Sequence, residues 1–286
     1  MSFIHVLILG IVQGLAELLP VSSSAHVVVA EKLLGLDPSS PPMTLLLVML
    51  HTGTMFAVIV FFWRRWQSIF FADRQVFTRA VVDVIIATVL TGVVGGVIIK
   101  SIEKFALPQG EGGAQIEDLF SHLELIAPAL FVAGILILVA GLAERRARGP
   151  KNDQITAKQS AWIGAVQGLC LPFRGFSRSG ATISTALLLG VSRASGEAFS
   201  FALAVVLTPP VVLREALRLR HMTHAGDVHL GSVWVSSLIG AVVAFIAGLA
   251  ALRWLSAWLE SGRWYLFGIY CLVASVAVFA LHLSGY

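Results

Sequence analysis

The sequence predicts an all-helical membrane protein with several spanning helices. Hydrophobic residues make up 57% of its 286 residues and charged residues 13%, about half the charged fraction usual in soluble domains. Four segments contain no Asp, Glu, Lys or Arg: 43–63, 125–143, 230–252 and 264–286. Each is long enough to cross a hydrocarbon core of roughly 30 Å as a helix. This charge distribution excludes a soluble fold.

Gly, Pro and charged residues divide the chain into ten apolar segments. These are 3–19, 22–36, 43–63, 80–99, 125–143, 160–171, 179–191, 194–213, 230–252 and 264–284. Six are long enough to span a membrane. The first and second segments form one pair and the sixth and seventh another, and each pair is interrupted by a proline and a Ser-rich stretch. We expect both pairs to be re-entrant helical hairpins with tips inside the protein, where non-helical backbone is tolerated.

A short motif recurs in the two halves of the chain. The sequence GIVQGL at 10–15 returns as GAVQGL at 164–169, and both copies continue into Leu-Pro and a serine cluster. We interpret the chain as a single transmembrane domain over 1–286, built from two repeats of five segments at about 1–145 and 155–286.

The basic residues predict the orientation. Loops 64–79, 144–159 and 253–263 carry eleven Lys and Arg, against five in loops 100–124 and 214–229. Cytoplasmic loops are enriched in Lys and Arg, so with re-entrant hairpins the first three loops are expected on the cytoplasmic side. The repeats are then inverted about the membrane plane, which brings broken helices together near the midplane. Charge alone leaves re-entrance open, because 64–79 and 144–159 would share a side even if all ten segments spanned.

Three further properties narrow the class. The formal charge is only +4 despite a pI near 9.4, so the basic residues fit membrane topology and no nucleic-acid partner is expected. Cys170 and Cys271 lie in apolar stretches and are expected to be buried and unpaired. The first residues lack the basic region of a cleavable signal, so we expect the N-terminus to be retained.

Ionisable side chains in or beside the apolar segments are the main functional signal, since each costs roughly 2.5–3.5 kcal/mol at the centre of an inserting helix. They are Glu17, His26, His51, Asp83, Arg174, Arg178, Arg193 and Glu197. Asp83 and Glu197 are expected in first helical turns, where the helix dipole stabilises a carboxylate, although Glu197 could instead brace an arginine. His51 either faces a site or pairs with a neighbour. Three histidines share a polar loop without regular ligand spacing, and no metal is expected there: His221, His224 and His229.

The first Ser-rich break combines a helix end with a helix start. Gln13 and Glu17 are four residues apart and share one helical face. Pro20 ends that helix, and Ser22–Ser24 begin the next one, followed by His26. A helix N-terminus offers unpaired N–H groups and a positive dipole end, which suit a phosphate.

The second break repeats this design and adds guanidinium groups. It contains Arg174, Ser177, Arg178, Ser179 and Thr182. Arginine matches phosphate oxygens in a bidentate manner. Serine caps and buried histidines also have purely structural roles, but the pairing of both breaks through the repeat favours a phosphate site with a nucleophile, its activator and charge clamps.

At these breaks the sequence resembles the undecaprenyl-diphosphate phosphatase family, the bacitracin-resistance type of bacterial membrane phosphatase. The matching motifs are (E/Q)xxxE at Gln13–Glu17, P-x-S-S-x-x-H at Pro20–His26 and G-x-S-R-S-G-A-T at Gly175–Thr182. Further similarity at Gly190–Arg193 and Glu197–Phe201 extends the resemblance over nearly the whole chain.

The resemblance implies hydrolysis of undecaprenyl diphosphate to undecaprenyl phosphate and inorganic phosphate, which recycles the lipid carrier for peptidoglycan synthesis and confers bacitracin resistance. It also implies an inverted-repeat fold with two re-entrant hairpins and a divalent cation, Mg²⁺ or Ca²⁺. One departure is Arg174, because the family usually has proline before the motif glycine. Gln13 is within the family pattern but leaves Glu17 as the only carboxylate of its motif, so Glu17 is the one candidate metal ligand.

Resemblance and chemistry together suggest Ser23 as the nucleophile, with His26 activating it; a direct attack by His26 is the rival. Glu17 is expected to orient His26 or hold a cation, and Arg178 to stabilise the transferring phosphoryl group. The remaining candidates are expected to bind substrate: Gln13, Ser22, Ser24, Arg174, Ser177, Ser179 and Thr182.

Two other classes of function stay open. Inverted repeats with a midplane polar site are also typical of transporters, so a flippase of undecaprenyl phosphate is the alternative, and a non-catalytic lipid-binding protein is a second. A channel or proton pump is disfavoured because the spans are nearly free of charge. We expect a multi-pass protein of the cytoplasmic (inner) membrane with its site open to the periplasmic or outer face. The sequence leaves a homodimer open.

Overall fold

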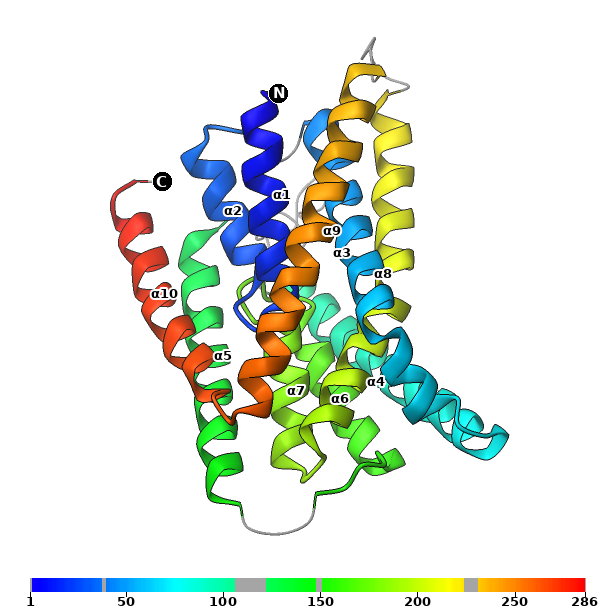
Figure 1. Cartoon of the computed structure of the whole chain (residues 1–286). Coiled ribbons are helices and arrows are strands. Elements are labelled where there is room, and N and C mark those ends of the chain that lie inside the picture. The colour runs from blue at the N-terminus through cyan, green and yellow to red at the C-terminus, as the bar shows by residue number, and fades with distance from the viewer. Residues whose placement is uncertain (1, 38–39, 106–121, 148–150, 224–230, 286) are drawn as a thin grey trace.

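The computed structural model describes residues 2–37, 40–105, 122–147, 151–223 and 231–285 (Figure 1). In these residues the chain forms ten helices. They are α1 (Phe3–Leu18), α2 (Ser23–Leu33), α3 (Pro41–Phe70), α4 (Arg74–Phe105), α5 (Leu123–Arg146), α6 (Ala157–Cys170), α7 (Arg178–Leu188), α8 (Arg193–Thr223), α9 (Gly231–Glu260) and α10 (Tyr265–Leu283).

Six helices are long and apolar enough to cross a membrane, namely α3, α4, α5, α8, α9 and α10. They are the six segments predicted to span, so the chain is a multi-pass membrane protein. The helices extend beyond the predicted bounds, and this corrects one expectation. Asp83 lies in the third turn of α4 and Glu197 in the second turn of α8, and neither helix has an acidic residue in its first turn. The helix dipole therefore does not account for these two carboxylates.

The four shorter helices form two antiparallel pairs that enter from opposite ends of the molecule (Figure 1). From the end that carries the N-terminus, α1 runs to mid-height, and α2 returns toward the same end. The helix α1 stops because Leu19 precedes Pro20 and adopts an extended conformation, with φ −80° and ψ 153°, as proline requires of its predecessor. At the opposite end α6 begins at a capping box formed by Thr156 and Gln159.

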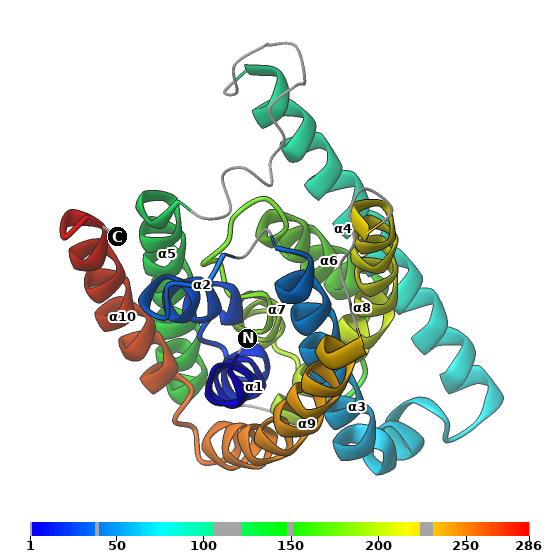
Figure 2. The same cartoon turned by 90° about the horizontal axis from the view of Figure 1, so that it is seen from above.

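The second pair places α7 at the centre of the bundle, as Figure 2 shows from above. Its residues Ser179 to Leu187 are all buried, and it packs against α5, α6 and α8. The tips of the two pairs meet there, because the Ser179 hydroxyl donates a hydrogen bond to the carbonyl oxygen of Leu19 at 3.2 Å. The polar breaks of the two pairs are thus held together inside the protein.

The repeated glycines set how α1 and α6 pack. A Cβ atom at Gly14 on α1 would lie 2.6 Å from Cβ of Ala247 on α9. A Cβ atom at Gly168, the matching residue of α6, would lie 2.8 Å from Cβ of Val94 on α4. Only glycine allows helices to approach this closely. The repeated motif therefore corresponds to two equivalent helix contacts, α1 on α9 and α6 on α4.

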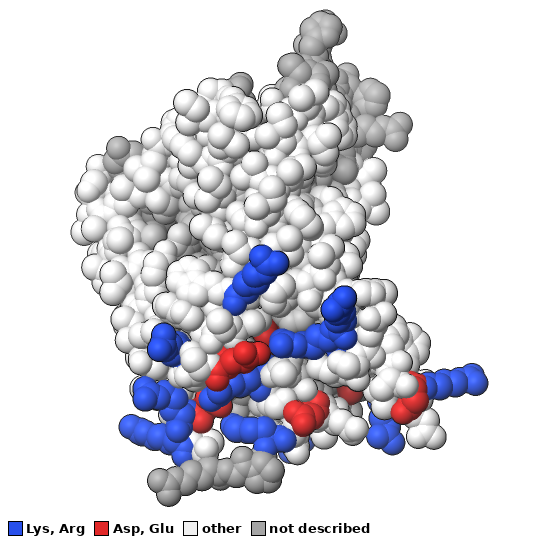
Figure 3. Space-filling model, viewed as in Figure 1, with Lys and Arg blue, Asp and Glu red and all other residues white. Residues whose placement is uncertain are grey.

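Charged side chains gather at one end of the molecule on the face that Figure 3 shows. The connections between α3 and α4, α5 and α6, and α9 and α10 lie at this end, whereas both termini lie toward the other end (Figure 1). The prediction that loops 64–79, 144–159 and 253–263 share one side is confirmed in the part of the chain that the structure describes.

Candidate active site

The Glu17 carboxylate at the end of α1 is the centre of the polar network between the two breaks. Its Oε2 atom accepts hydrogen bonds from the Ser23 hydroxyl at 2.5 Å and from the Gln13 amide at 3.2 Å. Its Oε1 atom accepts from Nη2 of Arg178 at 3.1 Å. Nε2 of His51 on α3 lies 3.8 Å from Oε2. Four predicted site residues, Gln13, Glu17, Ser23 and Arg178, are therefore brought together.

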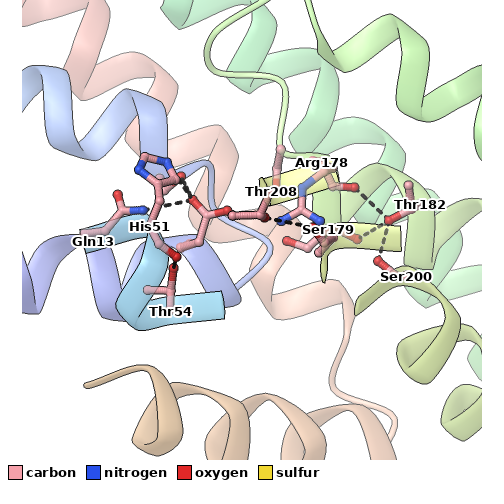
Figure 4. A network of polar contacts seen from close by, with 12 residues as sticks. Gln13, His51, Thr54, Arg178, Ser179, Thr182, Ser200 and Thr208 are labelled. Atoms are coloured by element: carbon pink, nitrogen blue, oxygen red, sulfur yellow. Dashed lines mark hydrogen bonds and ion pairs between the residues drawn. The ribbon is translucent and has the colours of Figure 1, made fainter. Parts of the chain in front are cut away.

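Figure 4 shows how this network is divided: Gln13 and His51 lie on one side, and Arg178, Ser179 and Thr182 on the other. His51 combines the two alternatives that the sequence left open, because one ring nitrogen pairs with its own helix and the other faces the Glu17 network. Its Nδ1 atom lies 2.8 Å from the Leu47 carbonyl oxygen, and a carbonyl only accepts, so Nδ1 carries the hydrogen. Nε2 of His51 is then the ring atom turned toward Glu17.

The turn that carries the serines is strained. Ser22 has a φ of 67°, and among the described residues it is the only one other than glycine with a positive φ. Such a conformation costs on the order of 1–3 kcal/mol and persists only where the surroundings hold it. The hydroxyl oxygens of Ser22 and Ser24 share a hydrogen bond at 3.3 Å. The Ser24 hydroxyl also accepts from the backbone N–H of Gly175 in the second break.

His26 is turned away from Ser23. Its Nδ1 atom lies 2.8 Å from the Ser22 carbonyl oxygen, and its Nε2 atom lies 2.7 Å from the hydroxyl of Tyr270 on α10. Within the described part of the chain no hydrogen bond joins His26 to Ser23. The expected contact between these two residues is therefore absent from this conformation, and the Ser23 hydroxyl has the Glu17 carboxylate as its partner instead.

Arg178, the first residue of α7, links the second break to the first. While its Nη2 atom binds Glu17, its Nη1 atom is buried and has no hydrogen-bond partner among the described residues. A buried guanidinium donor is expensive to leave unpaired. This nitrogen can therefore donate to a further acceptor at the site.

Three other predicted substrate-binding residues make structural contacts. The Ser177 hydroxyl caps α7 by accepting from the N–H of Gly180. The Ser179 hydroxyl binds the Leu19 carbonyl, as described above. Thr182 is fully buried and shares a hydrogen bond of 2.6 Å with Ser200 on α8. In this conformation these hydroxyls hold the break in place and are occupied by protein partners.

Arg174 has a carboxylate of the first pair among its neighbours. It interacts electrostatically with Glu31, which is 1% exposed on α2. The arginine that departs from the family pattern thus faces a buried carboxylate of the first pair. Its contact with a substrate phosphate stays a prediction.

The donor set does not fit a metal site built from protein groups alone. Among the described residues no group of three or more His, Cys, Asp or Glu side chains could hold an ion. The oxygens of Glu17 already accept hydrogen bonds from Arg178, Ser23 and Gln13. The polar-loop histidines do not bear on this point, because the side chain of His221 and residues 224 and 229 lie outside the described part.

Glu197 and Arg193, two of the ionisable residues that the sequence singled out, form ion pairs at the charged end. Glu197 accepts from Arg65 on α3 at 2.8 Å and from the Ser256 hydroxyl on α9 at 2.6 Å. Arg193 binds Glu144 on α5 through two nitrogens, at 2.7 and 2.9 Å. These contacts link α3, α5, α8 and α9, and they share no residue with the Glu17 network. Glu197 braces an arginine, the second of the two predicted alternatives.

Sequence reasoning missed Tyr270. It stands in an apolar segment, without a motif around it and far from both breaks in the chain. Only the packing of α10 beside α2 (Figure 2) brings its hydroxyl to His26. No local pattern in the sequence would have identified it.

Comparison with known proteins gives the site its context. Residues 6–277 match the model of the family described as bacitracin resistance protein BacA. The chain is 57% identical to undecaprenyl-diphosphatase 2 of Acinetobacter baylyi over 98% of both chains. It is 33% identical to undecaprenyl-diphosphatase 1 of Clostridioides difficile, over 96% of this chain and 93% of the relative, and 31% identical to the undecaprenyl-diphosphatase of Rhodopirellula baltica over 99% of both. With the family match covering almost its whole length, and with both family motifs meeting at one buried network, this chain belongs to the bacitracin resistance protein BacA family of membrane proteins.

Proposed function

We propose that this protein hydrolyses undecaprenyl diphosphate to undecaprenyl phosphate and inorganic phosphate. The observation that carries the proposal is the meeting of Ser23, Glu17 and Arg178 across the two breaks, at 2.5 Å and 3.1 Å. A hydroxyl nucleophile, a proton acceptor and a guanidinium with a free donor are the groups that phosphoryl transfer needs. A relative that shares 57% of its residues and bears the name undecaprenyl-diphosphatase supports this substrate.

In the proposed reaction the Ser23 Oγ atom attacks the terminal phosphorus of the diphosphate. The hydroxyl proton passes to Oε2 of Glu17, which already accepts its hydrogen bond, and the bond from phosphorus to the bridging oxygen breaks. The lipid monophosphate leaves with that electron pair and needs no strong acid, because it is a stable anion. Water then attacks the phosphoserine phosphorus and the bond from phosphorus to Oγ breaks. The proton held by Glu17 returns to Oγ, which restores the Ser23 hydroxyl and the Glu17 carboxylate, and the two water protons leave on inorganic phosphate as H₂PO₄⁻.

The geometry favours Glu17 over His26 as the group that takes the proton from Ser23. It also favours Ser23 over His26 as the nucleophile. Attack by histidine would use Nε2, since Nδ1 donates to the Ser22 carbonyl, and Nε2 is engaged by the Tyr270 hydroxyl. Arg178 is proposed to bind the phosphoryl oxygens through Nη1 and to stabilise the charge that develops on them.

We propose that Mg²⁺ or Ca²⁺ arrives with the diphosphate instead of residing in the protein. Magnesium sites in phosphate enzymes use one or two carboxylates together with substrate oxygens, and among the described residues Glu17 supplies the carboxylate that contacts Ser23 and Arg178. The cation would neutralise part of the negative charge of the diphosphate.

We further propose that the paired helices are re-entrant hairpins and that the two halves are inverted repeats. The supporting observation is that the matching short helices of the two halves pack in the same way, each on a long helix of the other half. Helix α1 packs on α9 through Gly10 and Gly14, and α6 packs on α4 through Gly164 and Gly168. Two hairpins that enter from opposite ends and meet at their polar tips fit an inverted arrangement.

The concentration of Lys and Arg at one end supports placing that end in the cytoplasm. The tip of the first pair then opens toward the outer face of the cytoplasmic membrane, where we propose that hydrolysis occurs. In the cell this activity would return the lipid carrier to peptidoglycan synthesis, sustain wall growth and cell shape, and lower sensitivity to bacitracin.

The alternative is a flippase that moves undecaprenyl phosphate without cleaving it, and the hairpin arrangement favours it as much as the enzyme. Phosphate release by purified protein in detergent distinguishes them. We expect release from undecaprenyl diphosphate that depends on Ser23. A protein that transports the monophosphate in vesicles but releases no phosphate would refute the proposed reaction.

A further inference from the structure

Helix α10 makes two polar contacts with the strained turn of the first pair. The Tyr270 hydroxyl lies 2.7 Å from Nε2 of His26. The next residue, Cys271, donates its S–H to the carbonyl oxygen of Pro20 at 3.3 Å. These adjacent residues of α10 therefore bind the chain three positions before and three positions after Ser23, at Pro20 in the turn and at His26 in the first turn of α2.

The Ser22 carbonyl oxygen determines which groups donate in the hydrogen bonds of His26. A carbonyl oxygen only accepts, so Nδ1 of His26 carries the hydrogen that is bound by Ser22 O at 2.8 Å. In a neutral imidazole Nε2 is then an acceptor, and Tyr270 donates to it. The two ring planes are nearly parallel, with an angle of 14° between them and 5.7 Å between the ring centres, so the rings also lie in aromatic contact.

The chain of hydrogen bonds from Tyr270 through His26 ends on Ser22, the residue with the strained backbone conformation. Ser22 holds its φ of 67° without a side-chain cap on α2, and its carbonyl oxygen is bound by both the N–H and the ring of His26. Ser23 follows directly. A shift of the Ser22 peptide would move the Ser23 hydroxyl relative to Glu17, and misplacement of a reacting group by about 1 Å can cost 10²-fold in rate.

The environment of Tyr270 supports a positioning role. Tyr270 is 46% exposed as a residue on a helix predicted to span the membrane, where a phenol hydroxyl without a partner is costly. A phenylalanine would suit the lipid side of this position. The hydroxyl has its partner in the first break.

We propose that Tyr270 is a positioning residue: through His26 it holds the strained Ser22 turn and thereby sets the Ser23 hydroxyl against Glu17. The proposal rests on the proposed function, since it assigns Ser23 as the nucleophile. It gives His26 a structural task in the first step, in place of the activation of Ser23.

The test compares Tyr270→Phe with Tyr265→Phe, which removes a hydroxyl from the same helix at the charged end. For Tyr270→Phe we expect kcat on undecaprenyl diphosphate to fall about five- to tenfold, the rate equivalent of one hydrogen bond, with KM within about twofold of the wild type. Tyr265→Phe should retain wild-type kcat. Both purified variants should keep the wild-type Tm within a few degrees.

Dependence on His26 separates positioning from a general packing effect. In a His26→Ala background, the additional change Tyr270→Phe should have no further effect on kcat, because the route from α10 to Ser22 is already lost. Equal losses with and without His26 would overturn the proposal, as would a kcat for Tyr270→Phe equal to that of Tyr265→Phe.

A spectroscopic measurement makes the proposal testable without activity. In protein labelled with [¹⁵N]histidine, the signals of His26 are identified by their loss in His26→Gln. We expect the Nδ1–H tautomer in the wild type and a shift of the Nε2 signal in Tyr270→Phe but not in Tyr265→Phe. An unchanged Nε2 signal would refute the contact, whereas a wild-type protein that shows the expected Nε2 shift on Tyr270→Phe but releases no phosphate would refute only the proposed function.

Discussion

The Glu17 carboxylate explains why so many predicted residues converge at one point. Glu17 is half-buried, and a carboxylate that has lost part of its water is stabilised when hydrogen bonds and opposite charges replace it. Ser23, Gln13 and Arg178 supply those partners at 2.5–3.2 Å. The same contacts that make the charge tolerable also align a hydroxyl with its proton acceptor.

Replacing Ser23 by alanine tests the nucleophile. We expect Ser23→Ala to lower phosphate release by about 10³-fold or more, because the attacking atom is removed and the other groups act only together with it. The measurement is initial-rate phosphate release from undecaprenyl or farnesyl diphosphate. Ser261→Ala, at an exposed position of the charged end, should behave as the wild type. Near-full activity in Ser23→Ala, with activity lost in His26→Ala, would instead identify histidine as the nucleophile.

Arg178 is tested by the conservative change to lysine. Lysine keeps the charge but not the planar group that reaches Glu17 with one nitrogen and the phosphoryl oxygens with another. Guanidinium stabilisation of phosphoryl transfer is worth 10³–10⁵ in rate in enzymes generally, so we expect Arg178→Lys to lose about 10³-fold in kcat. Arg253→Lys on the exposed side of α9 is the matched control. Wild-type kcat in Arg178→Lys would contradict the proposed role of Arg178 in stabilising the phosphoryl oxygens.

At the scale of elements, small residues decide where the broken helices lie. Pro20 ends α1 and the Ser-rich stretches start α2 and α7, so each break is specified locally. How deep the breaks lie depends on the repeated glycines, which let α1 and α6 pack closely against α9 and α4. A larger side chain there would displace the whole short helix together with its tip.

Gly164 provides a test of this packing. A Cβ atom at Gly164 would lie 2.3 Å from the Ala87 carbonyl oxygen of α4, whereas one at Gly92 of the same α4 would meet nothing within 4 Å. We expect Gly164→Ala to destabilise the protein by about 1–3 kcal/mol through overpacking. Gly92→Ala should be neutral or stabilising by up to about 1 kcal/mol from helix propensity. Thermal unfolding in detergent measures both, and equal Tm values would contradict the close contact.

For the whole molecule, the segregation of charge defines a direction across the membrane. The connections between α3 and α4, α5 and α6, and α9 and α10 share the charged end (Figures 1 and 3). Positive charge is retained on the cytoplasmic side during insertion. The polar tips of both helix pairs lie between this end and the opposite one.

Cysteine labelling tests the orientation in a variant that lacks Cys170 and Cys271. We expect Ser284→Cys, near the C-terminus, to react with a membrane-impermeant maleimide added to intact spheroplasts. Lys158→Cys, at the start of α6 and the charged end, should react only after the membrane is opened. The reverse pattern would place the charged end outside and the proposed reaction on the cytoplasmic face.

Much of the fold was predictable because each spanning segment must itself be apolar enough to enter the membrane. Spans need about 20 apolar residues, and all six appear as such in the sequence and as helices in the structure. The bounds were less predictable, since apolar composition marks the hydrocarbon core and the helices continue beyond it. That difference moved Asp83 and Glu197 out of the first turns in which they had been expected.

The sequence predicted which residues form the site better than it predicted the contacts between them. The repeated breaks identified Gln13, Glu17, Ser23 and Arg178, which the structure joins in one network. Residue spacing within one helix suggested that Ser23 would pair with His26, three positions later. The turn at Ser22 instead directs Ser23 back to Glu17, six residues earlier, a contact that spacing along a helix does not describe.

The few charges of this chain, and their positions between apolar spans and Ser-rich breaks, determined its class, its six spans and the two places where polar chemistry could occur. Those features are local, because inserting each segment depends on its own composition. Only the tertiary structure decided that Tyr270 reaches His26, that Arg65 holds Glu197 and that Arg178 closes on Glu17. Such pairs join residues more than 100 positions apart, and the packing of whole helices, which no local pattern encodes, brings them into contact.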